Sequence, residues 1–217
     1  MKKLAYKTCK NILITCGPTW IPVDHVRIIS NISTGKLGQS LARGLAKEGA
    51  KVTLLEGPVY DPLKSKNIRV VKFVFYDELS SLLRKELRKN YDVIIHAAAV
   101  SDYRLRKIHK TKIRSDRPRL NLQLVPTEKI ISIFKRLKPR AFLVGFKLET
   151  QATPRQIRDK VKKLFTAAQC DLVVANTVGH NEKYQGWIFD KDLNILARAR
   201  NRQEMSSRLI KRIKVKR

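Results

Sequence analysis

The chain has 217 residues, enough for one domain with a sizeable core, and its hydrophobic content of 43% is ordinary for a globular protein. No apolar run reaches the roughly 18 residues of a membrane-spanning helix, and no signal peptide follows the basic start, so we expect a cytoplasmic protein without a membrane partner. The net charge of +29 predicts attraction of anions, and the three cysteines (Cys9, Cys16 and Cys170) form no paired motif, so we expect Cys16 and Cys170 to be buried thiols.

The first half of the chain alternates short apolar runs with helical spacing. Between the first two runs, apolar residues recur at helical intervals from about Gly35, and Gly49 ends this helix. Asp77 is predicted to cap a charged helix that ends near Lys89, and residues 17–31 are predicted to form a loop. The runs predict buried strands at residues 11–16, 51–55, 68–75 and 92–97.

The second half continues this alternation. Thr127 is predicted to cap a helix through Leu137, Pro154 opens another, and a basic helix ends the chain. Further strands are predicted at residues 120–124, 142–146 and 172–175, with a hairpin at 187–189 and 193–197.

Alternating strands and helices predict an α/β, Rossmann-like fold, with a mostly parallel sheet covered by helices on both faces and a C-terminal hairpin. We expect one domain spanning residues 1–217. It includes a basic flap at about 104–119, which has no clear periodicity, and a basic tail at about 211–217.

A loop that leads into the first predicted helix is a candidate phosphate site. Ser33, Thr34 and Gly35 would offer hydroxyls and unpaired amides at the positive end of that helix. The segment fits neither a Walker loop nor the glycine pattern of dinucleotide-binding folds. The predicted site therefore belongs to another kind of phosphate-binding fold.

Four ordered motifs carry a resemblance to a known family. They are GPTWIPVDHVRIISNISTGKLG at 17–38, AAAVSDY at 97–103, GFKLET at 145–150 and VAN at 174–176. Together they resemble phosphopantothenate–cysteine ligases over about residues 11–197. The decarboxylase domain that often precedes this ligase in bacteria is not seen, so the resemblance is to a stand-alone ligase.

The resemblance implies a reaction and its participants. The ligase joins 4′-phosphopantothenate to cysteine through an acyl nucleotide, and it releases pyrophosphate and a nucleoside monophosphate. It uses CTP or ATP as cosubstrate with Mg²⁺, although no ligand cluster in the sequence predicts a dedicated metal site. A homodimer is also implied, and a nucleic-acid partner is not expected.

The resemblance also assigns roles to individual residues. Asn31 corresponds to the asparagine associated with the acyl nucleotide, and Arg27 to an arginine that could clamp a phosphate or carboxylate. Lys112 best matches the flap lysine that binds the triphosphate, with Lys107 and Lys110 as a competing register.

The remaining implied contacts are to the nucleotide. The resemblance implies that the backbone of Ala97, Ala98 and Ala99 contacts the base, and that Asp102 binds the ribose hydroxyls. It places Phe146 against the base and Lys160 near the nucleotide. Residues 127–130 depart from the Asn-Pro-Asp-Ile pattern of the family, and one of two helix lysines has no clear equivalent.

Two other functional classes are compatible with parts of the sequence. A short-chain-type oxidoreductase could use Glu56 for a ribose and Tyr103 with Lys107 as a catalytic pair, but the glycine-rich entry is missing. A basic nucleic-acid-binding module would bind through the flap and tail, and its affinity would fall steeply with salt.

Overall fold

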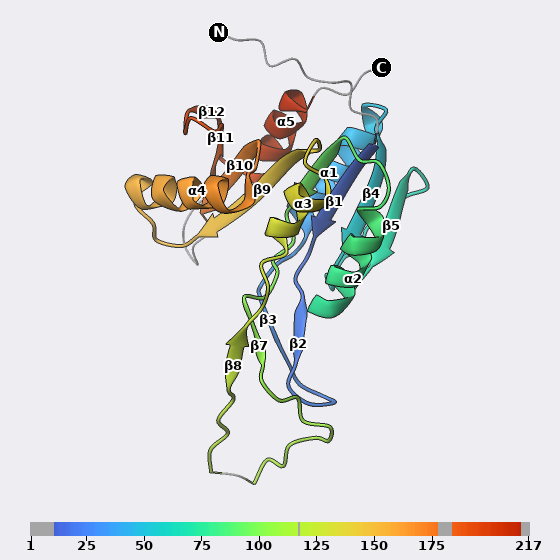
Figure 1. Ribbon diagram of the computed structural model, residues 1–217, viewed down its shortest axis with the longest axis vertical. Coiled ribbons are helices and arrows are strands. Elements are labelled where there is room, and N and C mark those ends of the chain that lie inside the picture. Colours follow the sequence, from blue (N-terminus) through green and yellow to red (C-terminus); the bar gives the residue numbers. More distant parts are fainter. Residues whose placement is uncertain (1–10, 117, 178–183, 214–217) are drawn as a thin grey trace.

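An eight-stranded sheet forms the centre of the protein, in a computed structural model that describes residues 11–116, 118–177 and 184–213 (Figure 1). Its strands are β1 (Asn11–Cys16), β4 (Lys51–Glu56), β5 (Ile68–Lys72), β6 (Val93–His96), β9 (Phe142–Glu149), β10 (Leu172–Thr177), β11 (Gln185–Phe189) and β12 (Ile195–Ala199). They run in the order β12-β11-β10-β9-β6-β1-β4-β5, parallel from β10 to β5, and β11 and β12 complete one edge as an antiparallel hairpin. The predicted α/β fold with a mostly parallel sheet is confirmed.

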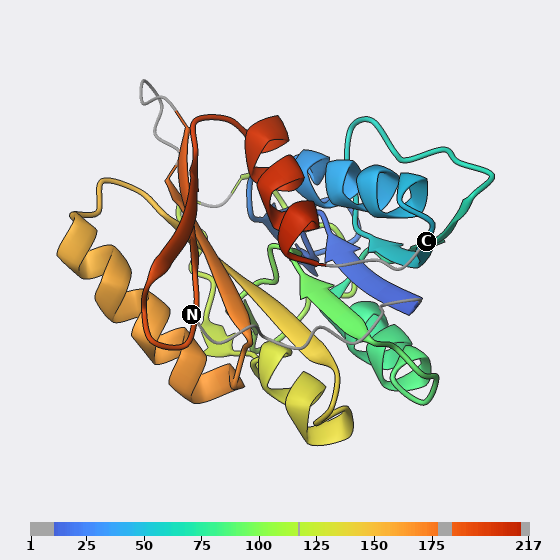
Figure 2. The same ribbon diagram turned by 90° about the horizontal axis from the view of Figure 1, so that it is seen from above.

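Helices cover both faces of this sheet. They are α1 (Lys36–Lys47), α2 (Tyr76–Glu86), α3 (Ile131–Leu137), α4 (Pro154–Ala168) and α5 (Arg202–Arg212). Seen from above, α1 and α5 lie together on one face, while α2, α3 and α4 cover the other (Figure 2). Because side chains alternate along a strand, Ile14 of β1 packs with Leu41 and Met205 in one core, and Leu13 packs with Phe134 in the other.

The register of the parallel strands brings the segments of interest to one edge. Thr15 pairs with His96, Cys16 with Glu56, and His96 with Gly145. The segments that follow β1, β4 and β6 therefore begin side by side at the carboxyl edge, where ligands bind in sheets of this type.

An arm of two short antiparallel sheets extends beyond this edge (Figure 1). One pairs β2 (Trp20–Pro22) with β3 (Ile28–Ser30), and the other pairs β7 (Tyr103–Leu105) with β8 (Leu124–Pro126). A small core of Ile21, Val23, Leu105 and Ile113 stabilises the arm. The predicted loop at 17–31 thus contains two strands, and the strand predicted at 120–124 begins only at Leu124, so both predictions were wrong in these details.

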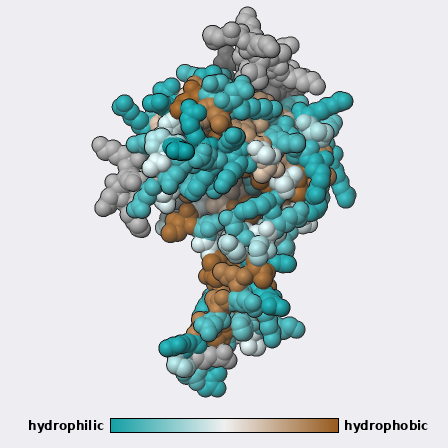
Figure 3. Space-filling view, turned by 60° about the vertical axis from the view of Figure 1, so that its left-hand side comes forward, coloured by the Kyte–Doolittle hydropathy of each residue, from teal (hydrophilic) through white to brown (hydrophobic). Residues whose placement is uncertain are grey.

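Apolar side chains remain exposed on the arm and flap. They are Val26, Ile28, Ile29, Ile32, Tyr103, Ile108, Leu120 and Leu124, with exposed fractions between 38% and 98%. Figure 3 shows apolar surface where the molecule narrows between its body and the arm. Contiguous apolar surface of this kind marks an interface in many soluble proteins.

Two helices begin elsewhere than predicted. Asp77 lies inside the first turn of α2, and Glu78 instead accepts a hydrogen bond from the backbone amide of Phe75 (3.3 Å). Thr127 does not cap α3, because this helix starts only at Ile131; the Thr127 hydroxyl instead donates to the carbonyl of Ser101 (2.7 Å). Glu78 therefore takes the role predicted for Asp77 at α2, and α3 begins without a side-chain cap.

A buried carboxylate ties α2 to the sheet. Glu86 accepts two hydrogen bonds from Arg69 (both 2.9 Å), one from the Tyr91 hydroxyl (2.6 Å) and two from Lys89. Burial by itself raises the pKa of Glu86, but these hydrogen bonds outweigh it and lower the pKa to about 2.

Cys16 and Cys170 are buried free thiols, as predicted, and burial raises the pKa of Cys170 to about 12. Cys9 and residues 214–217 of the predicted tail lie outside the described residues. None of the helices in the described ranges combines the length and apolar character needed to cross a membrane.

Candidate active site

The alanine segment after β6 is fastened to β1 through its backbone. The amides of Ala97, Ala98 and Ala99 donate to the carbonyl of Thr15 (3.0 Å), the hydroxyl of Thr15 (3.3 Å) and the carbonyl of Gly17 (2.9 Å). All three amides are therefore used within the protein. Among the described residues, the carbonyl oxygens of Ala97 and Ala98 accept no hydrogen bond, so a base read by this backbone would meet carbonyls.

The hydroxyl of Thr15 also contacts a buried histidine. Thr15 Oγ1 lies 2.8 Å from Nδ1 of His96, whose ring packs against Phe134 with centroids 5.0 Å apart. Burial lowers the pKa of His96 to about 4, so the ring is neutral at physiological pH. His96 thus supports the alanine segment from inside the protein.

Asn31 reaches the same segment from the end of β3. Its side-chain Nδ2 donates to the carbonyls of Ala99 (3.2 Å) and Val100 (3.3 Å). Within the described part of the chain its Oδ1 accepts no hydrogen bond, and the side chain is exposed. Asn31 and the alanine segment, both predicted to contribute to the site, are therefore in contact, with the amide oxygen open to a ligand.

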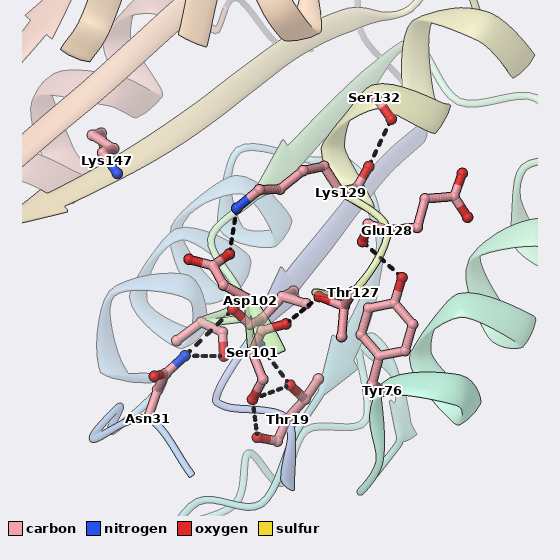
Figure 4. A network of polar contacts seen from close by, with 12 residues as sticks. Thr19, Asn31, Tyr76, Ser101, Asp102, Thr127, Glu128, Lys129, Ser132 and Lys147 are labelled. Carbon is pink, nitrogen blue, oxygen red and sulfur yellow. Dashed lines mark hydrogen bonds and ion pairs between the residues drawn. The ribbon is translucent and has the colours of Figure 1, made fainter. Parts of the chain in front are cut away.

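A polar network continues from this contact (Figure 4). The Ser101 amide donates to Thr19 Oγ1 (2.9 Å), and the Ser101 carbonyl accepts from the Thr127 hydroxyl (2.7 Å). Beside them the carboxylate of Asp102 pairs with Lys129 (2.5 Å), and both side chains are exposed. The sequence predicted Asp102 but not Lys129, which the ion pair adds to the site.

The predicted phosphate loop leads directly into α1. Gly35 precedes the helix with φ of 68°, a left-handed conformation suited to glycine, and as the N-cap residue it has no side chain that could cap α1. The first amides of the helix therefore keep their capacity to bind an anion. A Cβ at Gly38 would lie 2.3 Å from the Cβ of Cys16, so α1 packs directly on β1.

Arg27 lies between β2 and β3 and helps to hold the flap residue Ile113 against this hairpin. Its Nη1 donates to Asp24 (2.5 Å) and to the carbonyl of Ile113 (3.1 Å), and the amide of Ile113 donates to Asp24 (3.0 Å). The hydrogen bond from Ile113, opposed by burial but joined by those from Val26 and Arg27, holds the pKa of Asp24 well below its usual range. Arg27 was predicted to bind a phosphate or carboxylate, and one of its guanidinium nitrogens, Nη1, is bonded within the protein instead.

The flap lysines are exposed. Lys112 precedes the fixed residue Ile113, while Arg114 is paired with Asp116 (2.5 Å). Lys107 and Lys110 are also exposed, so exposure does not choose between the two registers. These side chains lie on the flap, and no described contact joins them to Asn31.

The two remaining predicted residues differ in their surroundings. Phe146 of β9 is half-buried and packs against the core. Lys160 pairs with Glu149, which Lys147 also contacts (3.2 Å). Burial raises the pKa of Glu149, but the hydrogen bonds from the two lysines outweigh it and lower the pKa. Lys160 is therefore engaged with a carboxylate of β9.

Comparison with known proteins places the chain. A family model described as "DNA/pantothenate metabolism flavoprotein C-terminal domain" matches residues 8–215. The chain belongs to this family.

Two related proteins are coenzyme A biosynthesis proteins. The chain is 41% identical over 170 residues to the coenzyme A biosynthesis bifunctional protein CoaBC of Thermococcus kodakarensis, covering 78% of this chain and 41% of the relative. It is 35% identical to CoaBC of Haemophilus influenzae, covering 86% and 44%. The chain thus spans less than half the length of these relatives.

Solved structures agree with the family. The DNA/pantothenate metabolism flavoprotein of Streptococcus pneumoniae is 26% identical, with a TM-score of 0.84, over 95% of this chain and 98% of that chain. A Cab2 mutant in complex with phosphopantothenate-cysteine, 20% identical with a TM-score of 0.73, covers 94% of this chain and 86% of its own and shares the fold.

Membership of this family agrees with the geometry around Glu56, which the oxidoreductase alternative needs as a ribose ligand. Glu56 is fully buried and accepts hydrogen bonds from Gln39 (2.7 Å), the amide of Leu63 (3.2 Å) and Lys72. Its carboxylate is therefore unavailable to a ribose. Among the residues that the structure describes, no cluster of three or more His, Cys, Asp or Glu side chains could hold a metal ion.

Proposed function

We propose that this chain has phosphopantothenate–cysteine ligase activity, joining 4′-phosphopantothenate to L-cysteine through an acyl nucleotide in coenzyme A biosynthesis. The observation that carries the proposal is the contact of Asn31 with the carbonyls of Ala99 and Val100, beside the exposed carboxylate of Asp102. Membership of the family and similarity to coenzyme A biosynthesis proteins support it.

In the first step, the carboxylate of phosphopantothenate attacks the α-phosphorus of the triphosphate, and pyrophosphate leaves. Residues 33–35 bind the phosphate of phosphopantothenate at the start of α1. Asp102 accepts hydrogen bonds from the ribose, the alanine carbonyls accept from the base, and Lys112 and Arg27 offset negative charge on the transferred groups.

In the second step, the cysteine amine attacks the acyl carbon. The amide bond forms, the nucleoside monophosphate leaves with the bonding electrons, and the amine loses a proton. The open Oδ1 of Asn31 suits this step, because it can accept a hydrogen bond from the attacking amine while Nδ2 stays on the two carbonyls.

The nucleotide is proposed to be CTP, with ATP as the alternative. Cytosine and adenine both carry an amino group that the carbonyls of Ala97 and Ala98 can accept from, so these carbonyls do not choose between them. Mg²⁺ is proposed to arrive with the triphosphate. The described residues form no metal-binding cluster, and neither step above depends on an ion held by the protein.

We also propose a homodimer that forms through the arm. Its exposed apolar side chains, among them Ile28, Ile29 and Leu124, would lose contact with water in a symmetric interface. Sedimentation of the protein should give twice the mass of one chain, and a monomer at micromolar concentration would contradict this part of the proposal. Because the proposed substrates are water-soluble metabolites, we place the activity in the cytoplasm.

The activity is tested by incubating the protein with phosphopantothenate, cysteine, Mg²⁺ and each nucleoside triphosphate in turn. We expect pyrophosphate and nucleoside monophosphate in equal amounts with the amide, and fastest with CTP. Absence of nucleotide cleavage with every triphosphate would rule the proposal out.

A further inference from the structure

The turn between β8 and α3 has a firmly held backbone. Four hydrogen bonds of 2.7 to 2.9 Å fix it to its surroundings, two of them from Thr127 (Figure 4). The donors are the amide and hydroxyl of Thr127, the hydroxyl of Tyr76 and the hydroxyl of Ser132, and the acceptors are the carbonyls of Asp102, Ser101, Glu128 and Lys129. The Cα of Lys129 is thereby fixed beside Asp102.

The side chain of Lys129, in contrast, bonds to the described residues only through its ammonium. Its ammonium pairs with Asp102 at 2.5 Å, and 66% of the Lys129 side chain and 63% of that of Asp102 are exposed. Exposed ion pairs contribute little to stability, because water screens them and two flexible side chains must be ordered. Exchange of the Asp102 carboxylate for another anion therefore costs little.

A second lysine borders the same place. His96 pairs with Gly145, so the next residues of β9, Phe146 and Lys147, run beside the alanine segment that follows β6. Figure 4 shows Lys147 on β9, apart from the network, and its ammonium contacts Glu149 (3.2 Å). Lys147 is thus already paired with a carboxylate, whereas the ammonium of Lys129 lies on Asp102 itself.

We propose that Lys129 is a ligand of the nucleotide phosphates, which leaves Asp102 when a nucleotide binds. This inference rests on the proposed function, in which Asp102 binds the ribose. The ribose hydroxyls replace the ammonium at Asp102, and the flexible stem of Lys129 carries its charge to the phosphates attached to that ribose. In the proposed function the flap lysine also binds these phosphates.

The test measures binding of nucleotides to the purified full chain in the absence of phosphopantothenate and cysteine. The series for both cytidine and adenosine comprises the nucleoside, monophosphate, diphosphate and triphosphate, each with Mg²⁺. Lys129→Gln should bind the triphosphate roughly tenfold more weakly than the unmodified protein, and bind the nucleoside equally well. Lys129→Arg should restore most of the affinity.

A matched control removes the same charge from the same helix region. Arg136 of α3 faces Glu128 at 3.8 Å and is exposed, so Arg136→Gln should leave the whole series unchanged. Equal triphosphate affinity in Lys129→Gln and the unmodified protein would overturn the proposal, as would a loss that is the same for nucleoside and triphosphate, since that would reflect a disturbed Asp102. If the unmodified protein binds the triphosphate but makes no amide, the proposed function fails, and the binding series still decides the role of Lys129. If it binds no triphosphate, both fail.

Discussion

Replacing Asn31 by aspartate tests the two roles proposed for its side chain, in which Nδ2 donates to the alanine segment and Oδ1 accepts from the cysteine amine. In Asn31→Asp the donor to the carbonyls of Ala99 and Val100 is lost, and a carboxylate faces two carbonyl oxygens instead. Each amide–carbonyl hydrogen bond contributes about 1 kcal/mol, so loss of both costs about 2 kcal/mol. If this loss of about 2 kcal/mol raises only the barrier to amide formation, that step slows about 30-fold.

The two steps are measured separately. Pyrophosphate release with phosphopantothenate and the triphosphate reports activation, and the amide product reports transfer to cysteine. We expect a normal first turnover of pyrophosphate and slow amide formation. Asn67→Asp, the same chemical change at an exposed position in the loop before β5, should leave both steps unaltered. Amide formation at the normal rate in Asn31→Asp would refute the reasoning.

Three further perturbations follow from the fold. Gly38→Ala places a methyl group 2.3 Å from a Cβ of β1. It should lower the free energy of unfolding by about 1–3 kcal/mol and raise the KM for phosphopantothenate. In thermal unfolding, Gly44→Ala should cost less, because its methyl meets the flexible end of a side chain. Asp24→Asn removes the anionic acceptor of the Ile113 amide, so trypsin should cut the flap faster, and an unchanged rate would show that another contact holds it. Glu86, whose pKa is lowered, contributes to the free energy of unfolding fully above pH 4.5, and this contribution is lost as pH falls toward 2. Glu86→Gln should therefore lower the free energy of unfolding by about 2 kcal/mol at pH 7, after allowance for solvent screening. In urea unfolding at a series of pH values, the variant should lose less stability toward acid pH than the unmodified protein.

Elements with a strong local pattern were predictable from the sequence. The apolar run of β1 and the helical spacing of Leu41 and Leu45 in α1 follow from burial, which repeats with the period of each element. The arm was not predictable in the same way. Its four strands have three residues each, and they are stabilised by partners distant in sequence, such as the pairing of Tyr103 with Pro126.

In the candidate site, too, some residues were predictable from local motifs and others only from the fold. The motifs around Asn31 and Ala97–Ala99 pointed to one place, and the fold brings them into contact. In the sequence Lys129 stands out only as part of a departure from the family pattern, because its ion pair with Asp102 depends on how the turn after β8 is held. Similarly, Lys160 carries no sign in the sequence of its pairing with Glu149. The roles of all these residues remain predictions.

The buried carboxylate of Glu56 limits what this scaffold can be engineered to do. Glycine substitutions in the first loop would not by themselves create a dinucleotide cofactor site, because the acid at the end of β4 is already bonded to Gln39, Leu63 and Lys72. Freeing it would strip the segment between β4 and β5 of its internal anchor. A redesign would have to rebuild that segment before it could accept a new cofactor.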